Sequence, residues 1–173
     1  MELRAAREAD LPAILAITND AILHTTAIWS LAPTTLEARQ SWLRERARQG
    51  YPVFVASADA DVLGFASYGD FRPWEGYRHT VEHSLYVDRR WRGRGVGKAL
   101  LARLVAHAGE AGKHAMVAGI ASENEISLRL HLGCGFREVG RLSEVGRKFE
   151  RWLDLVLLER LLASAGRDEK ERA

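Results

Sequence analysis

The segment best suited to chemistry is a turn that alternates glycine with basic residues. It reads Arg92-Gly93-Arg94-Gly95-Val96-Gly97, and Lys98 follows it. Glycine lets the backbone curl and approach a ligand without a Cβ clash. Free N–H groups at the start of a following helix favour a bound anion such as a pyrophosphate. The alternative is a tight turn with a solvated basic face, and the turn alone does not decide between them.

Two common nucleotide-binding motifs do not fit this turn. A P-loop requires Gly five residues before its Gly-Lys pair and Ser or Thr after it. Here Arg92 and Ala99 occupy those positions. A dinucleotide-binding fingerprint that begins at Gly93 requires Gly where Lys98 stands. The turn therefore needs another interpretation.

Hydrophobic periodicity places the turn between a strand and a helix. We predict strands over residues 2–6, 52–57, 62–68, 80–87, 115–121, 136–142 and 149–158. Helices are expected after Asp10, from a Thr34–Glu37 capping box to near Gly50, from Val96 to Gly112, and from Ser122 or Asn124 to about His131. Residues 23–33 form an expected loop. This order predicts an α/β fold, a mixed sheet with helices on both faces.

Composition excludes several classes of protein. The 173 residues are 47% hydrophobic and 28% charged, which is not typical of a disordered or fibrous chain. A net charge of +2 argues against a dedicated nucleic-acid binder. The single Cys134 excludes an intramolecular disulfide and suits a reducing compartment. We expect one domain over residues 1–165, a charged tail over 166–173, no signal peptide or membrane span, and a cytoplasmic location.

Two spaced motifs resemble those of the GCN5-related N-acetyltransferases (GNAT). The first is R-x-x-G-x-G at Arg92, Gly95 and Gly97, and the second is N-x-x-S-x-x-x-H-x-x-x-G-F from Asn124 to Phe136. The run from Phe71 to Val87 further resembles the phosphinothricin and methionine sulfoximine acetyltransferase subfamily. The resemblance implies the GNAT fold, with a mostly antiparallel mixed sheet of about seven strands.

The resemblance also implies acetyl-CoA as cosubstrate, without a metal. The pyrophosphate then lies on the glycine turn, and the strand before the turn pairs with the pantetheine arm. The implied cofactor-binding residues are Leu85, Tyr86, Val87, Arg92, Gly93, Arg94, Gly95, Val96, Gly97, Lys98, Asn124 and Ser127.

Acetyl transfer to an amine needs a base, because an amine must be neutral to attack a thioester. Glu82 is our candidate, acting directly or through a water; the alternative is an exposed strand carboxylate. The resemblance assigns the oxyanion-binding N–H group to Val87. His131 is either the acid for the departing thiolate or a packed histidine. His83 faces away from Glu82 by strand alternation, and reaches the same site only if the strand bulges.

An amino-acid substrate also presents a carboxylate, which an arginine can clamp with two hydrogen bonds. Arg72 is favoured for this role, and Trp74 for a pocket wall, by their positions in the subfamily. The expected substrate-binding residues are Arg72, Pro73, Trp74, Glu82, His83 and Ser84.

The leading hypothesis is an N-acetyltransferase for small amino-acid analogues such as methionine sulfoximine, methionine sulfone or phosphinothricin. The resemblance implies a homodimer, with no nucleic-acid or membrane partner. Two alternatives stay open. One is acetylation of another amine, such as a peptide N-terminus or a polyamine. The other is a non-catalytic sensor that binds acyl-CoA.

Overall fold

A computed structural model describes residues 1–162, so the tail predicted over 166–173 lies outside the described residues. The strands are β1 (Glu2–Ala5), β2 (Val53–Ala58), β3 (Asp61–Asp70), β4 (Thr80–Val87), β5 (Ala115–Ala121), β6 (Arg137–Lys148) and β7 (Arg151–Leu161). The α-helices are α1 (Leu11–His24), α2 (Leu36–Arg48), α3 (Val96–Glu110) and α4 (Glu125–Gly133). Short 3-10 turns cover Glu8–Asp10, Glu75–Tyr77 and Arg89–Trp91.

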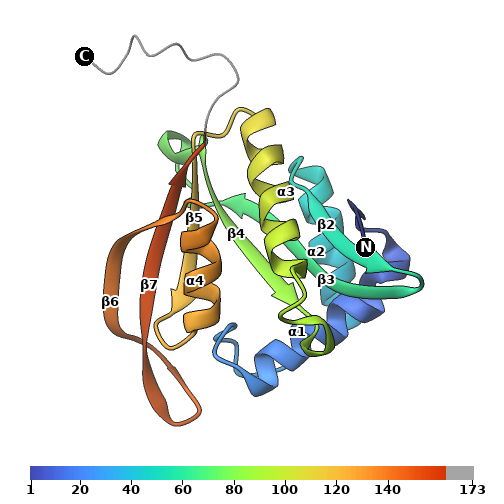
Figure 1. Cartoon of the computed structure of the whole chain (residues 1–173), viewed down its shortest axis with the longest axis horizontal. Helices are drawn as coiled ribbons and strands as arrows, with labels where there is room; N and C mark the ends of the chain where they lie inside the picture. The colour runs from blue at the N-terminus through green and yellow to red at the C-terminus, as the bar shows by residue number, and fades with distance from the viewer. Residues whose placement is uncertain (163–173) are drawn as a thin grey trace.

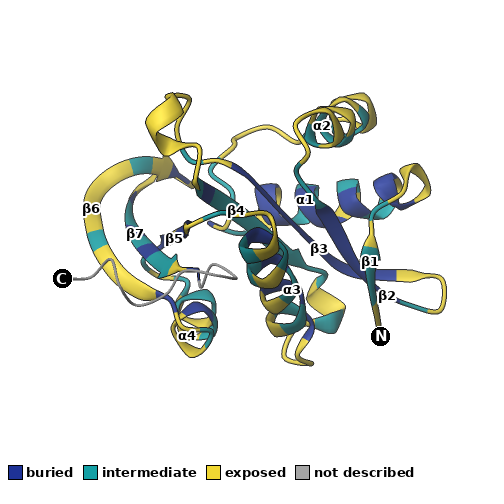
Figure 2. Ribbon diagram, turned by 90° about the horizontal axis from the view of Figure 1, so that it is seen from above, coloured by how far each residue is buried: buried dark blue, intermediate teal, exposed yellow. Residues whose placement is uncertain are grey.

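The strands form one seven-stranded sheet in the order β1-β2-β3-β4-β5-β7-β6. All neighbours are antiparallel except β4 and β5. Helices α1 and α2 pack on one face, and α3 and α4 on the other (Figure 2). The predicted fold class, a mostly antiparallel mixed sheet between helices, is therefore confirmed.

The central strands β4 and β5 pair over only a short stretch. β4 pairs with β5 only where Thr80–Glu82 face Ala115–Val117. Beyond that point β4 stays with β3 while β5 stays with β7, so the sheet opens into a fork (Figure 1). Leu100, Leu101 and Leu104 of α3 are fully buried and help to fill the core on one face of this region. We refer below to the opening between β4 and β5 as the fork.

Two predicted helix caps need correction. The N-cap of α2 is Thr35, which accepts a hydrogen bond from the N–H of Ala38, and not Thr34. Thr34 instead exchanges two backbone hydrogen bonds with the side chain of Asn19. Asp10 precedes α1 as expected, but its carboxylate does not cap that helix. It accepts hydrogen bonds from Arg4, because β1 brings this guanidinium within 2.7 Å.

The last hairpin also differs from the prediction. Phe149 was expected to start a strand, yet it lies in the turn between β6 and β7, with φ of 52°. The two strands are longer than predicted and pair with each other from Lys148–Arg151 outward. The loop predicted over residues 23–33 begins only after His24, where α1 ends.

One buried lysine fixes that loop. Lys148 is 4% exposed, and its ammonium group donates to the carbonyl oxygens of Ile22, Thr25 and Ile28. A cation at the end of α1 also suits the negative end of the helix dipole. Nearby, Trp29 packs so closely on Gly146 that an added Cβ would lie 2.3 Å from its ring. The β6–β7 hairpin thus holds the segment after α1 in place.

We expect Lys148→Met to lower the free energy of unfolding by about 2–4 kcal/mol, because the carbonyl groups lose a charged donor. Lys113→Met is the matched control, since Lys113 donates to one carbonyl, that of Arg78, at the surface. Urea denaturation of both variants measures the difference. If Lys148→Met lowers the free energy of unfolding no more than the control does, the stabilising role of Lys148 is contradicted.

Candidate active site

The fork leaves backbone groups of β4 without a neighbouring strand. The N–H of Asp88 donates to the carbonyl of Leu63 at 2.9 Å, which fixes the alternation of the β3–β4 ladder. Leu85 and Val87 then occupy non-hydrogen-bonded positions, so their N–H groups point away from β3. Because β5 has already diverged, these groups face the fork. They are suited to bind an extended ligand as an added strand would.

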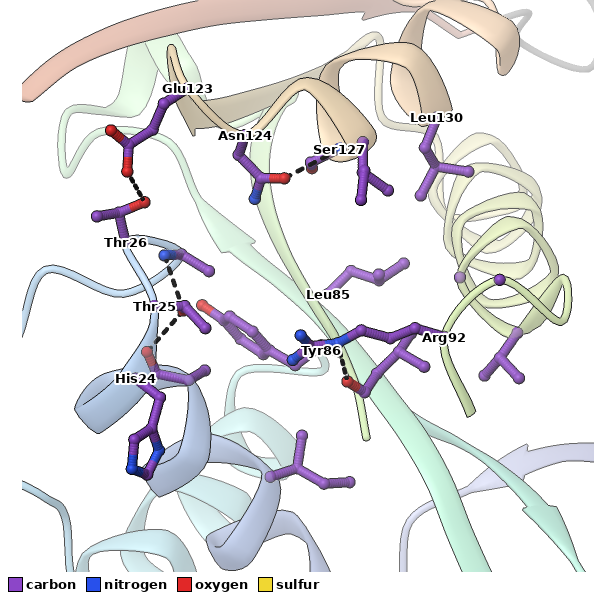
Figure 3. A pocket seen from close by; sticks show the side chains of 18 of the residues that line it. His24, Thr25, Thr26, Leu85, Tyr86, Arg92, Glu123, Asn124, Ser127 and Leu130 are labelled. Carbon is purple, nitrogen blue, oxygen red and sulfur yellow. Dashed lines mark hydrogen bonds between the residues drawn. The ribbon is translucent and has the colours of Figure 1, made fainter. Parts of the chain in front are cut away.

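A cavity of about 750 Å³ opens at the fork, between α1, the start of α3 and α4 (Figure 3). It contains almost every residue predicted to bind the cofactor. These are Leu85, Tyr86, Val87, Arg92, Gly93, Gly95, Val96, Gly97, Lys98, Asn124 and Ser127. Arg94 does not line it, since its guanidinium stacks 4.9 Å from the ring of Trp91.

The glycine turn forms the anion-binding end of this cavity. Gly93 and Gly95 have φ of 74° and 81°, in the left-handed region that a side chain would strain. Gly95 is the N-cap of α3, so the first N–H groups of that helix are free to donate. Arg92 donates through Nε to the carbonyl of Val87 at 3.2 Å, which joins the turn to β4.

The opposite wall is the start of α4. Asn124 caps this helix, because its Oδ1 accepts from the N–H of Ser127 at 3.2 Å. Figure 3 shows both residues facing Leu85 and Tyr86 of β4 across the cavity. The two predicted motifs therefore lie on opposite walls of one groove.

Sequence reasoning missed the third wall, which is the end of α1 and the loop that follows. Residues 24–27 line the cavity together with Glu123 and Arg151. Thr26 Oγ1 donates to Glu123 Oε1 at 2.8 Å (Figure 3). Arg151 pairs with the same carboxylate. No motif marks these residues, since their contacts join segments that are far apart in the chain.

Glu82 lies at the point where β4 and β5 part. The carboxylate is half-buried, and a Cβ added to Gly119 of β5 would lie 3.4 Å from its Oε1. Burial raises the pKa of Glu82, and the positive charge of Arg72 opposes that shift. Glu82 lines none of the cavities described here, although Ser84, two residues further along β4, does. A half-buried carboxylate with a raised pKa is suited to general base catalysis.

His83 lies on the other face of the sheet, as alternation predicted, but the bulge expected in β4 is absent. The β3–β4 register runs without interruption from Val81 to Val87. The ring of His83 stacks on His131, with centroids 5.0 Å apart, and also packs against Phe136. His83 and Glu82 therefore do not turn toward a common face.

The protonation of the histidine pair follows from its hydrogen bonds. His131 is 3% exposed, and its Nδ1 donates to the carbonyl of Ser127 at 2.7 Å. In the neutral ring Nε2 is then an acceptor, so His83 Nε2 donates to it at 3.1 Å. Burial lowers both pKa values, that of His83 to about 3. This geometry favours the packed alternative for His131, because the neutral ring holds no proton on Nε2.

The predicted substrate-binding residues are only partly brought together. Arg72 lies over the ring of Phe71 at 4.3 Å and close enough to Glu82 to affect its pKa. Trp74 is 67% exposed and, like Pro73, lines none of the cavities described here. Ser84 lines a second cavity on the α1–α2 face.

Two further observations concern residues 1–162. None of their helices is long and apolar enough to cross a bilayer. They also contain no group of three or more His, Cys, Asp or Glu side chains placed to hold a metal ion.

The chain is similar to known acetyltransferases over most of its length. The model of the acetyltransferase (GNAT) family matches residues 14–136. An L-methionine sulfoximine/L-methionine sulfone acetyltransferase of Pseudomonas paraeruginosa is 54% identical, over 91% of this chain and 92% of that protein.

Solved structures agree with this similarity. A ribosomal-protein-alanine N-acetyltransferase from Brucella melitensis is 49% identical, with a TM-score of 0.92 over 94% of this chain and 100% of that one. A GNAT superfamily phosphinothricin acetyltransferase from Sinorhizobium meliloti, in complex with AcCoA, is 32% identical. Its TM-score is 0.92 over 99% of this chain and 94% of that one.

The histidine pair should be harder to protonate in the folded protein than in the unfolded chain. We expect the ring resonances of His83 to keep constant NMR shifts from pH 8 to pH 5, because burial lowers its pKa to about 3, and we expect those of His131 to titrate below their unfolded midpoint, because burial lowers its pKa as well. In the urea-unfolded chain they should titrate near about 6.5. The pair thus stabilises the fold above that pH and loses the contribution as the pH falls. A folded-state midpoint near the unfolded value would contradict this assignment.

Proposed function

Because the chain belongs to the acetyltransferase (GNAT) family, we propose that it transfers the acetyl group of acetyl-CoA to the α-amine of a small amino acid. The proposed acceptors have side chains that end in an oxidised sulfur or a phosphinate. One observation supports this most strongly. At the fork, free N–H groups of β4 and the glycine turn lie on one side, where the larger cavity opens. Glu82 and a small polar cavity lie on the other side.

Acetyl-CoA fits the larger cavity in both shape and charge. The N–H groups at the start of α3 bind its pyrophosphate, with Arg92 and Lys98 as neighbouring cations. The N–H of Leu85 pairs with the pantetheine arm. The N–H of Val87 donates to the thioester oxygen, which gains negative charge as the amine attacks.

Glu82 prepares the nucleophile. An α-amine is largely protonated at neutral pH, and the Glu82 carboxylate takes the proton directly or through a water. Arg72, whose charge acts on Glu82, binds the α-carboxylate of the same substrate. The acetyl group passes directly from thioester to amine, without an acyl-enzyme. His83 and His131 support β4 on the face opposite Glu82.

The acceptor class follows the relatives. The 54% identical relative from Pseudomonas paraeruginosa acetylates methionine sulfoximine and methionine sulfone, as its name states, and the Sinorhizobium meliloti relative is a phosphinothricin acetyltransferase. A second candidate is a protein N-terminus, which the relative from Brucella melitensis suggests. The acceptor-side cavity of about 420 Å³ favours a small molecule over a peptide chain.

A homodimer in the cytoplasm is part of this proposal. β6 is an edge strand, and apolar side chains of the β6–β7 hairpin are exposed, among them Val139, Leu142, Val145 and Trp152. An exposed apolar patch on an edge strand is suited to pairing with a second copy.

We expect a thiol-release assay with acetyl-CoA to give strong turnover of methionine sulfone, methionine sulfoximine or phosphinothricin. Glutamate, spermidine and an alanine-initiated peptide complete the panel. Selective turnover of the first three supports the proposed acceptor class. Preference for the peptide would support the second candidate, and bound acetyl-CoA without turnover of any amine would support a sensor.

Glu82→Gln should lower kcat/KM by roughly 10²- to 10⁴-fold, because the base is lost while the shape is kept. The affinity for acetyl-CoA should not change. In the wild type, activity should fall as the pH drops through a pKa above the usual 4.5, since burial raises the pKa of Glu82. This acidic limb should vanish in the variant. Glu75→Gln, an exposed carboxylate in the segment before β4, is the control. An unchanged rate in Glu82→Gln would remove Glu82 from the base role.

A further inference from the structure

The second cavity lies on the α1–α2 face of the sheet and encloses about 420 Å³. Its polar lining comes from four elements of the fold: Thr18 of α1, Thr34 of the following loop, Arg39 and Trp42 of α2, and Ser84 and Tyr86 of β4. None of its lining residues is acidic. The only charge in its wall is therefore the guanidinium of Arg39.

Arg39 has donors that nothing in the described chain uses. Its Nε is buried and has no hydrogen-bond partner, and among residues 1–162 no carboxylate lies within salt-bridge distance. The guanidinium lies 5.0 Å from the ring centre of Trp42. That contact uses the face of the guanidinium and leaves the N–H groups in its plane free. An unpaired buried donor costs free energy, so its presence in a cavity wall points to a ligand.

The position of Arg39 relative to Glu82 determines which part of a substrate Arg39 can contact. Glu82, Ser84 and Tyr86 alternate onto one face of β4, and each second residue advances about 6.6 Å along the strand. Tyr86 lines the cavity together with Arg39, and the charges of both Arg39 and Glu82 act on it. Burial raises the pKa of Tyr86 to about 12, while Arg39 lowers it and Glu82 raises it through their charges. Glu82 itself does not line this cavity, but Ser84, two residues further along β4, does, so a substrate side chain that runs along β4 from an amine at Glu82 reaches the cavity.

We propose that Arg39 determines specificity by donating hydrogen bonds to the oxygen on sulfur or phosphorus at the end of the acceptor side chain. This proposal rests on the proposed function and deepens it. Arg72 remains assigned to the α-carboxylate, so each arginine recognises one end of the substrate. A sulfone, sulfoximine or phosphinate supplies strong acceptors for a guanidinium. A thioether or an alkyl chain supplies none of comparable strength and leaves Arg39 unpaired, which is an effective way to reject it.

The test compares Arg39→Met with Arg46→Met. Arg46 is also a half-buried arginine of α2 with an unpaired Nε, but it lies over Tyr51 and outside the cavity. For methionine sulfone we expect Arg39→Met to lower kcat/KM roughly 10- to 100-fold, mainly through KM. Slow turnover of methionine should change little or rise. Arg46→Met should leave the ratio between the two acceptors unchanged.

Two readouts separate recognition from folding. The KM for acetyl-CoA should be the same in all variants, because Arg39 does not line the larger cavity. Arg39→Lys, which keeps a charge but lacks the planar fork, should restore part of the sulfone preference. An equal loss for methionine and methionine sulfone, or no loss for either, would overturn the role of Arg39. Absence of turnover of methionine sulfone, methionine sulfoximine and phosphinothricin alike in the wild type would instead overturn the proposed function itself.

Discussion

The site depends on how briefly β4 and β5 pair. Three residues of each strand face each other before β5 turns to β7. The antiparallel ladder with β3 satisfies half of the backbone groups of β4 and leaves the others at an open edge inside the molecule. A buried strand edge is costly unless a ligand or another strand covers it. In this fold, the open edge of β4 lies where α3, α4 and the end of α1 converge.

The two faces of β4 also present environments that differ in charge. On one face of β4, His83 and His131 share a hydrogen bond in a stacked pair whose pKa values are lowered by burial. On the other face, Glu82 is half-buried beside the positive charge of Arg72 and near a polar cavity. Strand alternation alone therefore places a packed histidine and a half-buried carboxylate one residue apart. An intervening bulge would have mixed the two environments, and the unbroken register prevents it.

Local patterns predicted much of this arrangement. The bounds of β4 and β5 agree with the prediction. β5 is an apolar run, and β4 carries Val81, Leu85 and Val87 at alternate positions, as a strand pattern requires. The glycine turn and the motif that begins at Asn124 were found because each combines specific residue types close together in sequence. The cap of α4 stayed open between Ser122 and Asn124, and the structure shows that it is Asn124. Thr35 was missed because its neighbour Thr34 is chemically identical, and only Asn19, 15 residues earlier, decides between them. Residues 24–27 were missed for a related reason, since they line the cavity only through contacts between segments far apart in the chain, such as that of Thr26 with Glu123.

The three carbonyl groups held by Lys148 have a consequence for redesign. A single ammonium group from the β6–β7 hairpin fixes the end of α1 and the loop that forms one wall of the groove. The conformation of the loop therefore depends partly on a contact from outside it. Anyone who grafts a foreign segment between α1 and α2 to change the accepted amine must graft a compatible hairpin with it, and two stretches about 120 residues apart become one unit of exchange.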